Sequence, residues 1–177
     1  MAHRLKQREL NNLFIEHIGA HVDVIGDRNK RPLYLNLGAP YFRTVVAYIY
    51  NCTNPPGGRN PGEYKIQMTD GPRGKKICYD DPKGRTVLMV GYAEIVLGDM
   101  VEHEWVLFET AKHRIVAYSA NIQIYLHQLL RALNQEIAVC VKGNKETVVI
   151  ARSQYLPQAL EKRFDIDQQK LLERNRQ

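Results

Sequence analysis

The sequence predicts an α+β fold, a single domain in which a mainly antiparallel β-sheet is flanked by three helices. Three observations support this prediction. Apolar residues recur at helical spacing near both ends and once in the second half. Runs rich in β-branched and aromatic residues fill most of the remaining chain, and segments rich in turn formers separate them. The order is a helix, about five strands, a helix, two strands and a helix, which fits a flat sheet or one curled into an open barrel.

The first predicted helix runs from about residue 4 to about residue 19, because Leu10, Leu13, Phe14 and Ile18 share one helical face. Residues 43–50 are β-branched and aromatic on both faces, which predicts a strand covered on both sides. Residues 51–62 are dense in turn formers, and residues 63–68 then alternate polar with apolar side chains. We expect these two strands to form one hairpin with a long tip.

The second half of the chain repeats these patterns. Further strands are expected at residues 86–92, 104–109, 115–124, 139–141 and 147–150. The strand at 115–124 leads into a helix with apolar positions from Ile122 to Leu133, and the last two strands flank a turn and predict a hairpin. Pro157 suits the first turn of a final helix.

The length of 177 residues fits one domain. We expect residues 1–164 to form it and residues 165–177, which have few apolar anchors, to form a polar helical tail or linker. No apolar stretch approaches the roughly 18 residues of a membrane helix, and the charged N-terminus lacks a secretory core. The three cysteines contain no C-x-x-C pair. The sequence therefore predicts a cytoplasmic protein with no membrane association, metal or cofactor.

The charge distribution points to a polyanionic partner. The net charge is +6, and excess Lys and Arg raise the affinity for nucleic acid. Residues 59–76 contain five cations but only two acidic residues, Glu63 and Asp70. These cations are Arg59, Lys65, Arg73, Lys75 and Lys76.

The loop of residues 51–59 contains glycines and amides that let a backbone approach phosphate, with Asn51 and Arg59 as contacts. It lacks the residue order of a nucleotide-binding P-loop, which disfavours an ATPase. Ordinary loop punctuation is the alternative interpretation.

A first row of polar side chains lies on residues 63–68, where strand alternation places Glu63, Lys65 and Gln67 on one face. This row could be a solvated strand face. It could also bind DNA, with Lys65 on phosphate and Gln67 on the edge of an adenine.

A catalytic interpretation is also open, because E-x-K on a strand is half of the signature of Mg²⁺-dependent PD-(D/E)xK nucleases. The signature also needs an Asp on the preceding strand. No Asp lies between Asp27 and Asp70, so we assign no catalytic residues and keep this nuclease, with Glu63 and Lys65, as the alternative.

A second polar row aligns Ser119, Asn121 and Gln123, if residues 118–124 form a strand. Short polar side chains on a rigid strand suit readout of base edges. Alternatively, Ser119 is the N-cap of the following helix and Asn121 lies in its first turn.

Several short motifs between residues 41 and 160 carry a family resemblance. They are Tyr48-Ile-Tyr-Asn-Cys-Thr, Gly57-Gly-Arg, Glu63-Tyr-Lys-Ile-Gln, Val87-Leu-Met-Val-Gly-Tyr, Tyr118-Ser-Ala-Asn-Ile-Gln-Ile and Glu146-Thr-Val-Val-Ile-Ala-Arg. Together they resemble the N-terminal DNA-recognition domain of restriction endonucleases and methylase-associated defence proteins. The resemblance implies a module that reads double-stranded DNA ahead of a separate nuclease domain. Its pattern tolerates Arg in place of Lys65, which argues against a catalytic lysine.

The sequence thus predicts a DNA-recognition module of a restriction-modification or phage-defence system. No nuclease domain follows Gln177, so we expect the nuclease to be another domain or subunit.

Overall fold

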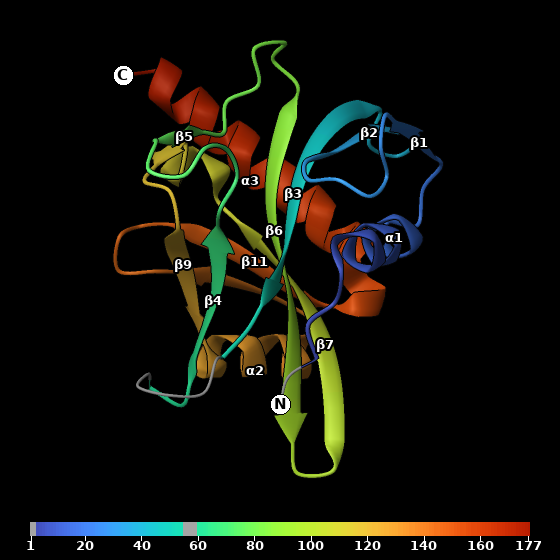
Figure 1. Ribbon diagram of the computed structural model, residues 1–177, viewed down its shortest axis with the longest axis vertical. Coiled ribbons are helices and arrows are strands. Elements are labelled where there is room, and N and C mark those ends of the chain that lie inside the picture. Colours follow the sequence, from blue (N-terminus) through green and yellow to red (C-terminus); the bar gives the residue numbers. More distant parts are fainter. Residues whose placement is uncertain (1–2, 55–59) are drawn as a thin grey trace.

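The computed structural model describes residues 3–54 and 60–177 and confirms the predicted α+β domain (Figure 1). Its centre is a seven-stranded sheet in the order β1-β2-β3-β6-β7-β11-β10, and this sheet stays open rather than closing into a barrel. Neighbouring strands are antiparallel except β3 and β6, which are parallel. The strands of this sheet are β1 (Val22–Ile25), β2 (Leu33–Leu37), β3 (Arg43–Cys52), β6 (Thr86–Leu97), β7 (Met100–Phe108), β10 (Ile137–Val141) and β11 (Thr147–Arg152).

Two small antiparallel pairs lie outside this sheet. One joins β4 (Glu63–Met68) to β9 (Ala120–Tyr125), and the other joins β5 (Ile77–Cys78) to β8 (Ile115–Val116). The described α-helices are α1 (Gln7–His17), α2 (Leu126–Gln135) and α3 (Leu156–Asn175), with short 3₁₀ turns at Thr110–Lys112 and Ser153–Tyr155. None of the helices in the described ranges has the length and apolar character needed to cross a bilayer.

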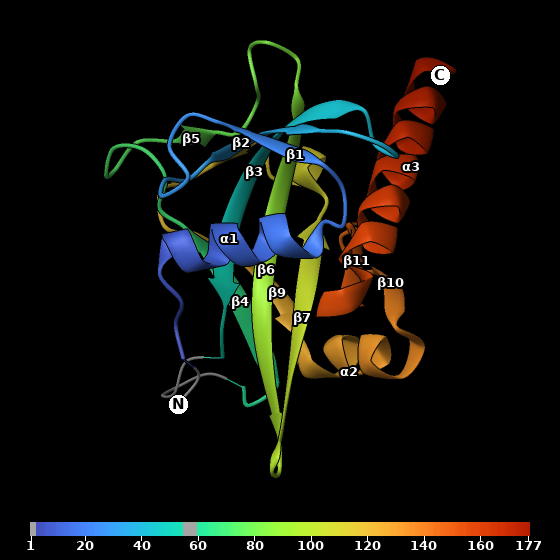
Figure 2. The same ribbon diagram turned by 90° about the vertical axis from the view of Figure 1, so that its right-hand side faces the viewer.

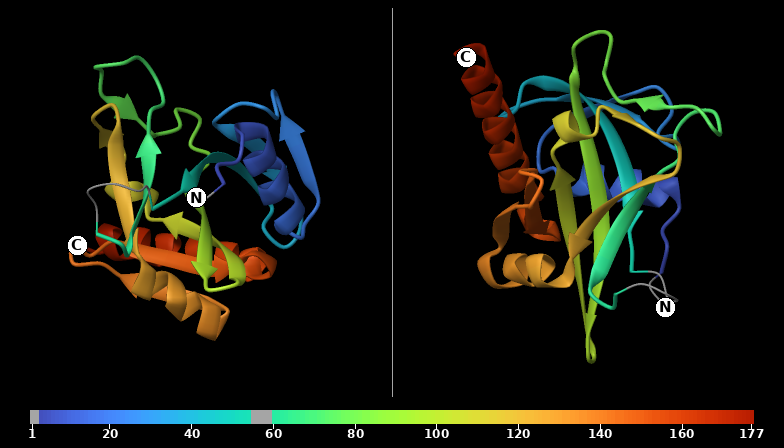
Figure 3. Two further views of the ribbon diagram at one scale, coloured as in Figure 1. Left: turned by 60° about the horizontal axis from the view of Figure 1, so that its bottom comes forward. Right: turned by 90° about the vertical axis from the view of Figure 1, so that its left-hand side faces the viewer.

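The large sheet separates two hydrophobic clusters. On one face, α1 and α3 pack against it with residues such as Phe14 and Leu160 (Figure 2). On the other face, β4, β9 and α2 cover it with residues such as Ile66, Ile122 and Leu129. The right panel of Figure 3 shows β4 and β9 running side by side in front of the sheet. The pair formed by β4 and β9 is therefore a second layer built on a covered sheet.

The predicted hairpin between residues 43–50 and 63–68 is wrong. β3 pairs with β2 and β6, and β4 touches its end through one isolated bridge between Thr53 and Lys65. The burial patterns explain this difference. Most of β3 is buried on both faces, so it belongs inside a covered sheet, whereas β4 buries alternate residues toward its C-terminal end and can cover another layer.

Other boundaries differ from the prediction in smaller ways. β1 and β2 were not predicted, although Leu33, Leu35 and Leu37 of β2 alternate and are buried. The predicted strand at 115–124 is two short strands, whereas the hairpin of β10 and β11 is confirmed.

The last helix, α3, runs through residue 165 without a break. Beyond that point Asp167 binds the buried Arg163, and Lys170 donates to the buried Glu109. The domain boundary at 165 stays a prediction, but these contacts tie the start of the predicted tail to the sheet.

Candidate nucleic-acid interface

The two polar rows expected from the sequence lie on one surface. β4 and β9, which we call the ribbon, pair antiparallel with Glu63 opposite Tyr125, Lys65 opposite Gln123 and Gln67 opposite Asn121. Residues directly opposite each other in an antiparallel pair point to the same side. These six side chains therefore share one face, which we call the outer face. The β-strand at 120–125 also excludes the alternative that Asn121 lies in the first turn of α2.

The inner face of the ribbon is fixed to the sheet. Ile66, Ile122 and Ile124 are buried there. Gly91 of β6 lies directly beneath, since a Cβ atom at this position would come within 3.1 Å of Ile66 Cγ2 and 3.0 Å of Cys52 Cβ. The missing side chain lets the ribbon approach the sheet closely, so the outer face is held by a rigid support.

Three amide side chains of the outer face are open to solvent: Gln67, Asn121 and Gln123. Glu63 and Lys65 are half-buried, and each interacts with other groups of the protein. Tyr125, which is 39% exposed, completes the face. Sequence reasoning missed it, although the alternation from Asn121 and Gln123 extends to this position.

Ser119 holds Gln67 in place at the end of the ribbon. Gln67 Nε2 donates to Ser119 Oγ at 2.7 Å, and the Ser119 amide donates to the Met68 carbonyl at 2.8 Å. α2 begins at Leu126, so the alternative of Ser119 as its N-cap is wrong. Gln67 keeps its Oε1 and a second Nε2 hydrogen. These are the groups that pair with an adenine edge.

Three of the five cations noted between residues 59 and 76 lie on the loop that leaves β4. Arg73, Lys75 and Lys76 are all exposed there, and none of them has an ion-pair partner among the described residues. They follow the ribbon directly beyond Met68. Arg59 falls outside the described residues.

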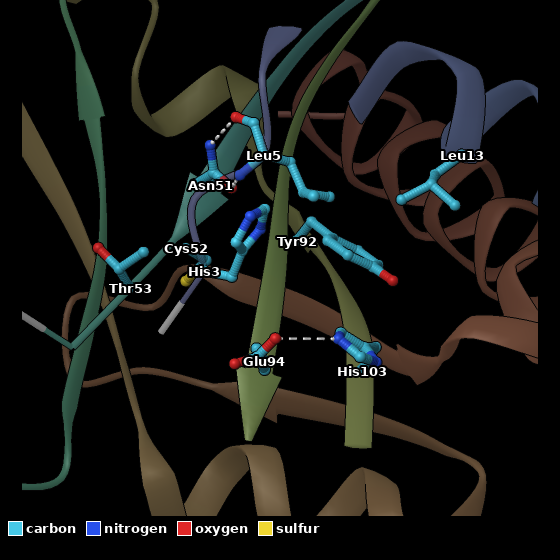
Figure 4. A pocket seen from close by; sticks show the side chains of 9 residues that line it. All are labelled: His3, Leu5, Leu13, Asn51, Cys52, Thr53, Tyr92, Glu94 and His103. Atoms are coloured by element: carbon cyan, nitrogen blue, oxygen red, sulfur yellow. Dashed lines mark hydrogen bonds and ion pairs between the residues drawn. The ribbon is translucent and has the colours of Figure 1, made fainter. Parts of the chain in front are cut away.

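Asn51 has a different place from the one the sequence suggested. Its Oδ1 accepts from the Leu5 amide at 3.0 Å and its Nδ2 donates to the Leu5 carbonyl at 2.8 Å (Figure 4). The side chain thereby anchors the N-terminal segment, here residues 3–6, across the end of β3. Its role as a DNA contact stays a prediction, but its amide already has two hydrogen-bond partners within the protein.

The N-terminal segment contributes to the walls of two cavities. The one in Figure 4, about 140 Å³, contains the pair of His103 and Glu94 with Nε2 and Oε2 3.3 Å apart, and the His103 ring stacks on Tyr92. The other, about 320 Å³, lies toward the ribbon and includes Gln67 in its wall. No single sequence motif predicts this second cavity, because its residues come from separate segments.

The nuclease alternative is not favoured. Glu63 and Lys65 do share a face, but no group of three or more His, Cys, Asp or Glu in the described ranges is placed to hold a metal ion. The carboxylate that follows β4, Asp70, is engaged by Arg31 and by the hydroxyls of Tyr50 and Tyr79.

Residues 43–160 match a protein-family model described as Methylase-associated X1. The match runs from β3 to the first part of α3 and includes both strands of the ribbon. No curated protein and no solved structure matches the chain. The family match bears out the methylase-associated part of the resemblance, while a DNA-recognition role stays a prediction.

Proposed function

Since the chain belongs to the Methylase-associated X1 family, we propose that it is the DNA-binding recognition module of a restriction-modification system. In this proposal the ribbon reads double-stranded DNA by sequence or by modification state. A separate nuclease domain or subunit cuts the DNA, and the module works in the cytoplasm, where such a system meets foreign DNA.

The register of the ribbon is the observation that carries this proposal. It places Lys65 beside Gln123 and Gln67 beside Asn121 on one solvent-facing surface. The major groove of B-DNA admits a two-stranded β-ribbon, and six residues per strand span about 20 Å. The outer face therefore has a shape and a chemistry suited to base edges in that groove.

Each kind of side chain has a defined task in this arrangement. The amides of Gln67, Asn121 and Gln123 read base edges, since Asn and Gln pair bidentately with adenine. The exposed cations Lys75 and Lys76 lie on the loop beyond the ribbon and contact phosphates, which fixes the register of the protein on the duplex.

The test separates these two tasks by fluorescence anisotropy on a duplex selected from a random library. Replacing Asn121 or Gln123 by Ala should weaken the binding free energy by about 1–3 kcal/mol on the selected duplex and by much less on unrelated DNA. Replacing Lys75 and Lys76 together by Ala should weaken binding to both duplexes alike and reduce the salt slope by roughly one unit per lost contact.

Gln169, an exposed amide on α3, provides the matched control, and Gln169→Ala should leave both affinities unchanged. Circular dichroism and melting curves must show that every variant folds. If folded Asn121→Ala and Gln123→Ala proteins discriminate between the duplexes as well as the parent, the ribbon does not read bases. If the parent binds no duplex at low salt, methylated or unmethylated, the proposed function fails.

A further inference from the structure

The larger of the two cavities, about 320 Å³, opens between the ribbon and the N-terminal segment. Its walls contain two guanidinium groups, two hydroxyls and two amides, and no carboxylate lines it among the described residues. The lining residues are Arg4, Leu5, Arg31, Tyr50, Asn51, Gln67 and Thr69. A polar cavity with this excess of donors suits a compact anion.

Arg31 is held in one orientation at this wall. Its Nε lies 2.7 Å from Asp70 Oδ1, its Nη1 donates to Gln7 Oε1 at 3.1 Å, and its guanidinium lies 4.1 Å from the centre of the Tyr50 ring. Its third nitrogen, Nη2, has no hydrogen-bond partner among the described residues. A guanidinium fixed in this way loses little side-chain entropy when it binds a ligand.

The partner that fixes Arg31 is itself fully engaged. Asp70 Oδ2 accepts from the hydroxyls of Tyr50 at 2.5 Å and Tyr79 at 2.8 Å. Burial, followed by the charge of Asp70, raises the pKa of Tyr50, so its hydroxyl stays protonated and donates. Asp70 offsets the charge of Arg31. Arg31 therefore supplies directed donors, while the exposed Arg4 supplies the net positive charge.

We propose that this cavity binds one phosphate group of a nucleotide, held as part of the DNA strand that the ribbon reads. The inference rests on the proposed function, because Gln67 belongs both to the outer face and to the cavity wall. A base edge at Gln67 and a backbone phosphate in the cavity would lie within one binding footprint. Arg31 Nη2, Arg4 and the hydroxyl of Thr69 are the donors to the phosphate oxygens.

The experiment couples a change in the protein to a change in the DNA. The protein variant is Arg4→Gln with Thr69→Val, two exposed positions, and Arg28→Gln, an exposed arginine outside the cavity lining, is the matched control. The DNA is a set of duplexes in which one phosphate at a time is replaced by an uncharged methylphosphonate. Calorimetry with inorganic phosphate, deoxyadenosine and deoxyadenosine monophosphate forms a second arm.

At one position, or two adjacent ones, we expect a methylphosphonate to lower the DNA affinity of the parent and of the Arg28→Gln control about tenfold. The same replacement should leave the Arg4→Gln/Thr69→Val protein nearly unchanged, because its contact is already lost. Suppose that the parent binds duplex DNA, but each methylphosphonate lowers the affinities of the parent and of the Arg4→Gln/Thr69→Val variant by the same factor. The phosphate site is then refuted while the proposed function stands.

The second arm covers the case in which no duplex binds and the proposed function fails. Binding of deoxyadenosine monophosphate but not deoxyadenosine, lost in the double variant, would then support the phosphate site with a free nucleotide as the source. Absence of binding to duplex, nucleotide and inorganic phosphate would overturn it.

Discussion

A buried carboxyl group beneath the ribbon should make the stability of the protein fall as the pH rises. Glu104 lies on the face of β7 that points toward the ribbon layer, opposite Ala93 of β6. Its side chain is fully buried, and neither oxygen has a hydrogen-bond partner among the described residues. Burial raises its pKa to about 8, and the nearby charge of Arg152 offsets only part of this effect.

The sign and size of the effect follow from proton linkage. Between the usual pKa of 4.5 and the folded value of about 8, the folded protein keeps a proton that the unfolded chain has lost. The stabilisation is complete below the lower value and is lost as the pH rises through the upper one. The slope is about 1.4 kcal/mol per pH unit, which gives an upper limit of about 5 kcal/mol over the window.

Urea unfolding of the parent and of Glu104→Gln at several values between pH 5 and pH 8.5 measures this directly. The amide does not ionise, so the two proteins should differ by about 1 kcal/mol or less at pH 5, and the variant should become the more stable one by several kcal/mol at pH 8.5. Glu173→Gln, at an exposed position, controls for net charge. Parallel profiles for the parent and Glu104→Gln would refute the reasoning.

Three further predictions concern other parts of the fold. Removing residues 165–177 should lower the unfolding free energy by about 3–5 kcal/mol, because Glu109 loses its Lys partner inside the protein; an unchanged urea midpoint would contradict this. Gly91→Ala should lower the unfolding free energy by about 1–3 kcal/mol, because the new methyl group pushes the ribbon away from the sheet, and it should also weaken DNA discrimination. A variant as stable as the parent would contradict the close contact. Burial lowers the pKa of His17, whose Nδ1 accepts from Trp105 Nε1, so stability present above pH 6.5 should be lost as the pH falls below it. The emission of Trp105, the single tryptophan, should shift there, and His17→Asn should abolish that shift.

The periodicity of the sequence predicted which side chains the ribbon exposes but not how its strands pair. Strand alternation depends on neighbouring residues, so the facing of Gln67, Asn121 and Gln123 could be inferred locally. Alternation does not determine which strand pairs with residues 63–68. The prediction that they pair with the nearest strand in sequence, residues 43–50, is therefore wrong. The pairing with residues 120–125 depends on how two layers pack, which no short window of sequence contains.

The cavity beside the ribbon could not be predicted from the sequence for a similar reason. Arg4, Arg31 and Thr69 come from three separate segments, and none of them stands in a motif. Arg31 gains its fixed orientation from Gln7, Tyr50 and Asp70, which lie far from it along the chain. The predicted loop cations Arg73, Lys75 and Lys76 needed no such information, because a charged, turn-rich segment is exposed wherever it lies.

The strict division of the ribbon into an inner and an outer face has an evolutionary consequence. Ile66 and Ile122 belong to the hydrophobic cluster under the ribbon, whereas Gln67 and Asn121 are exposed. Substitutions at the exposed amide positions of the outer face are therefore nearly neutral for folding, while each one alters the hydrogen-bonding pattern offered to a partner. A lineage under pressure to change its target can diversify these few positions on an unchanged scaffold.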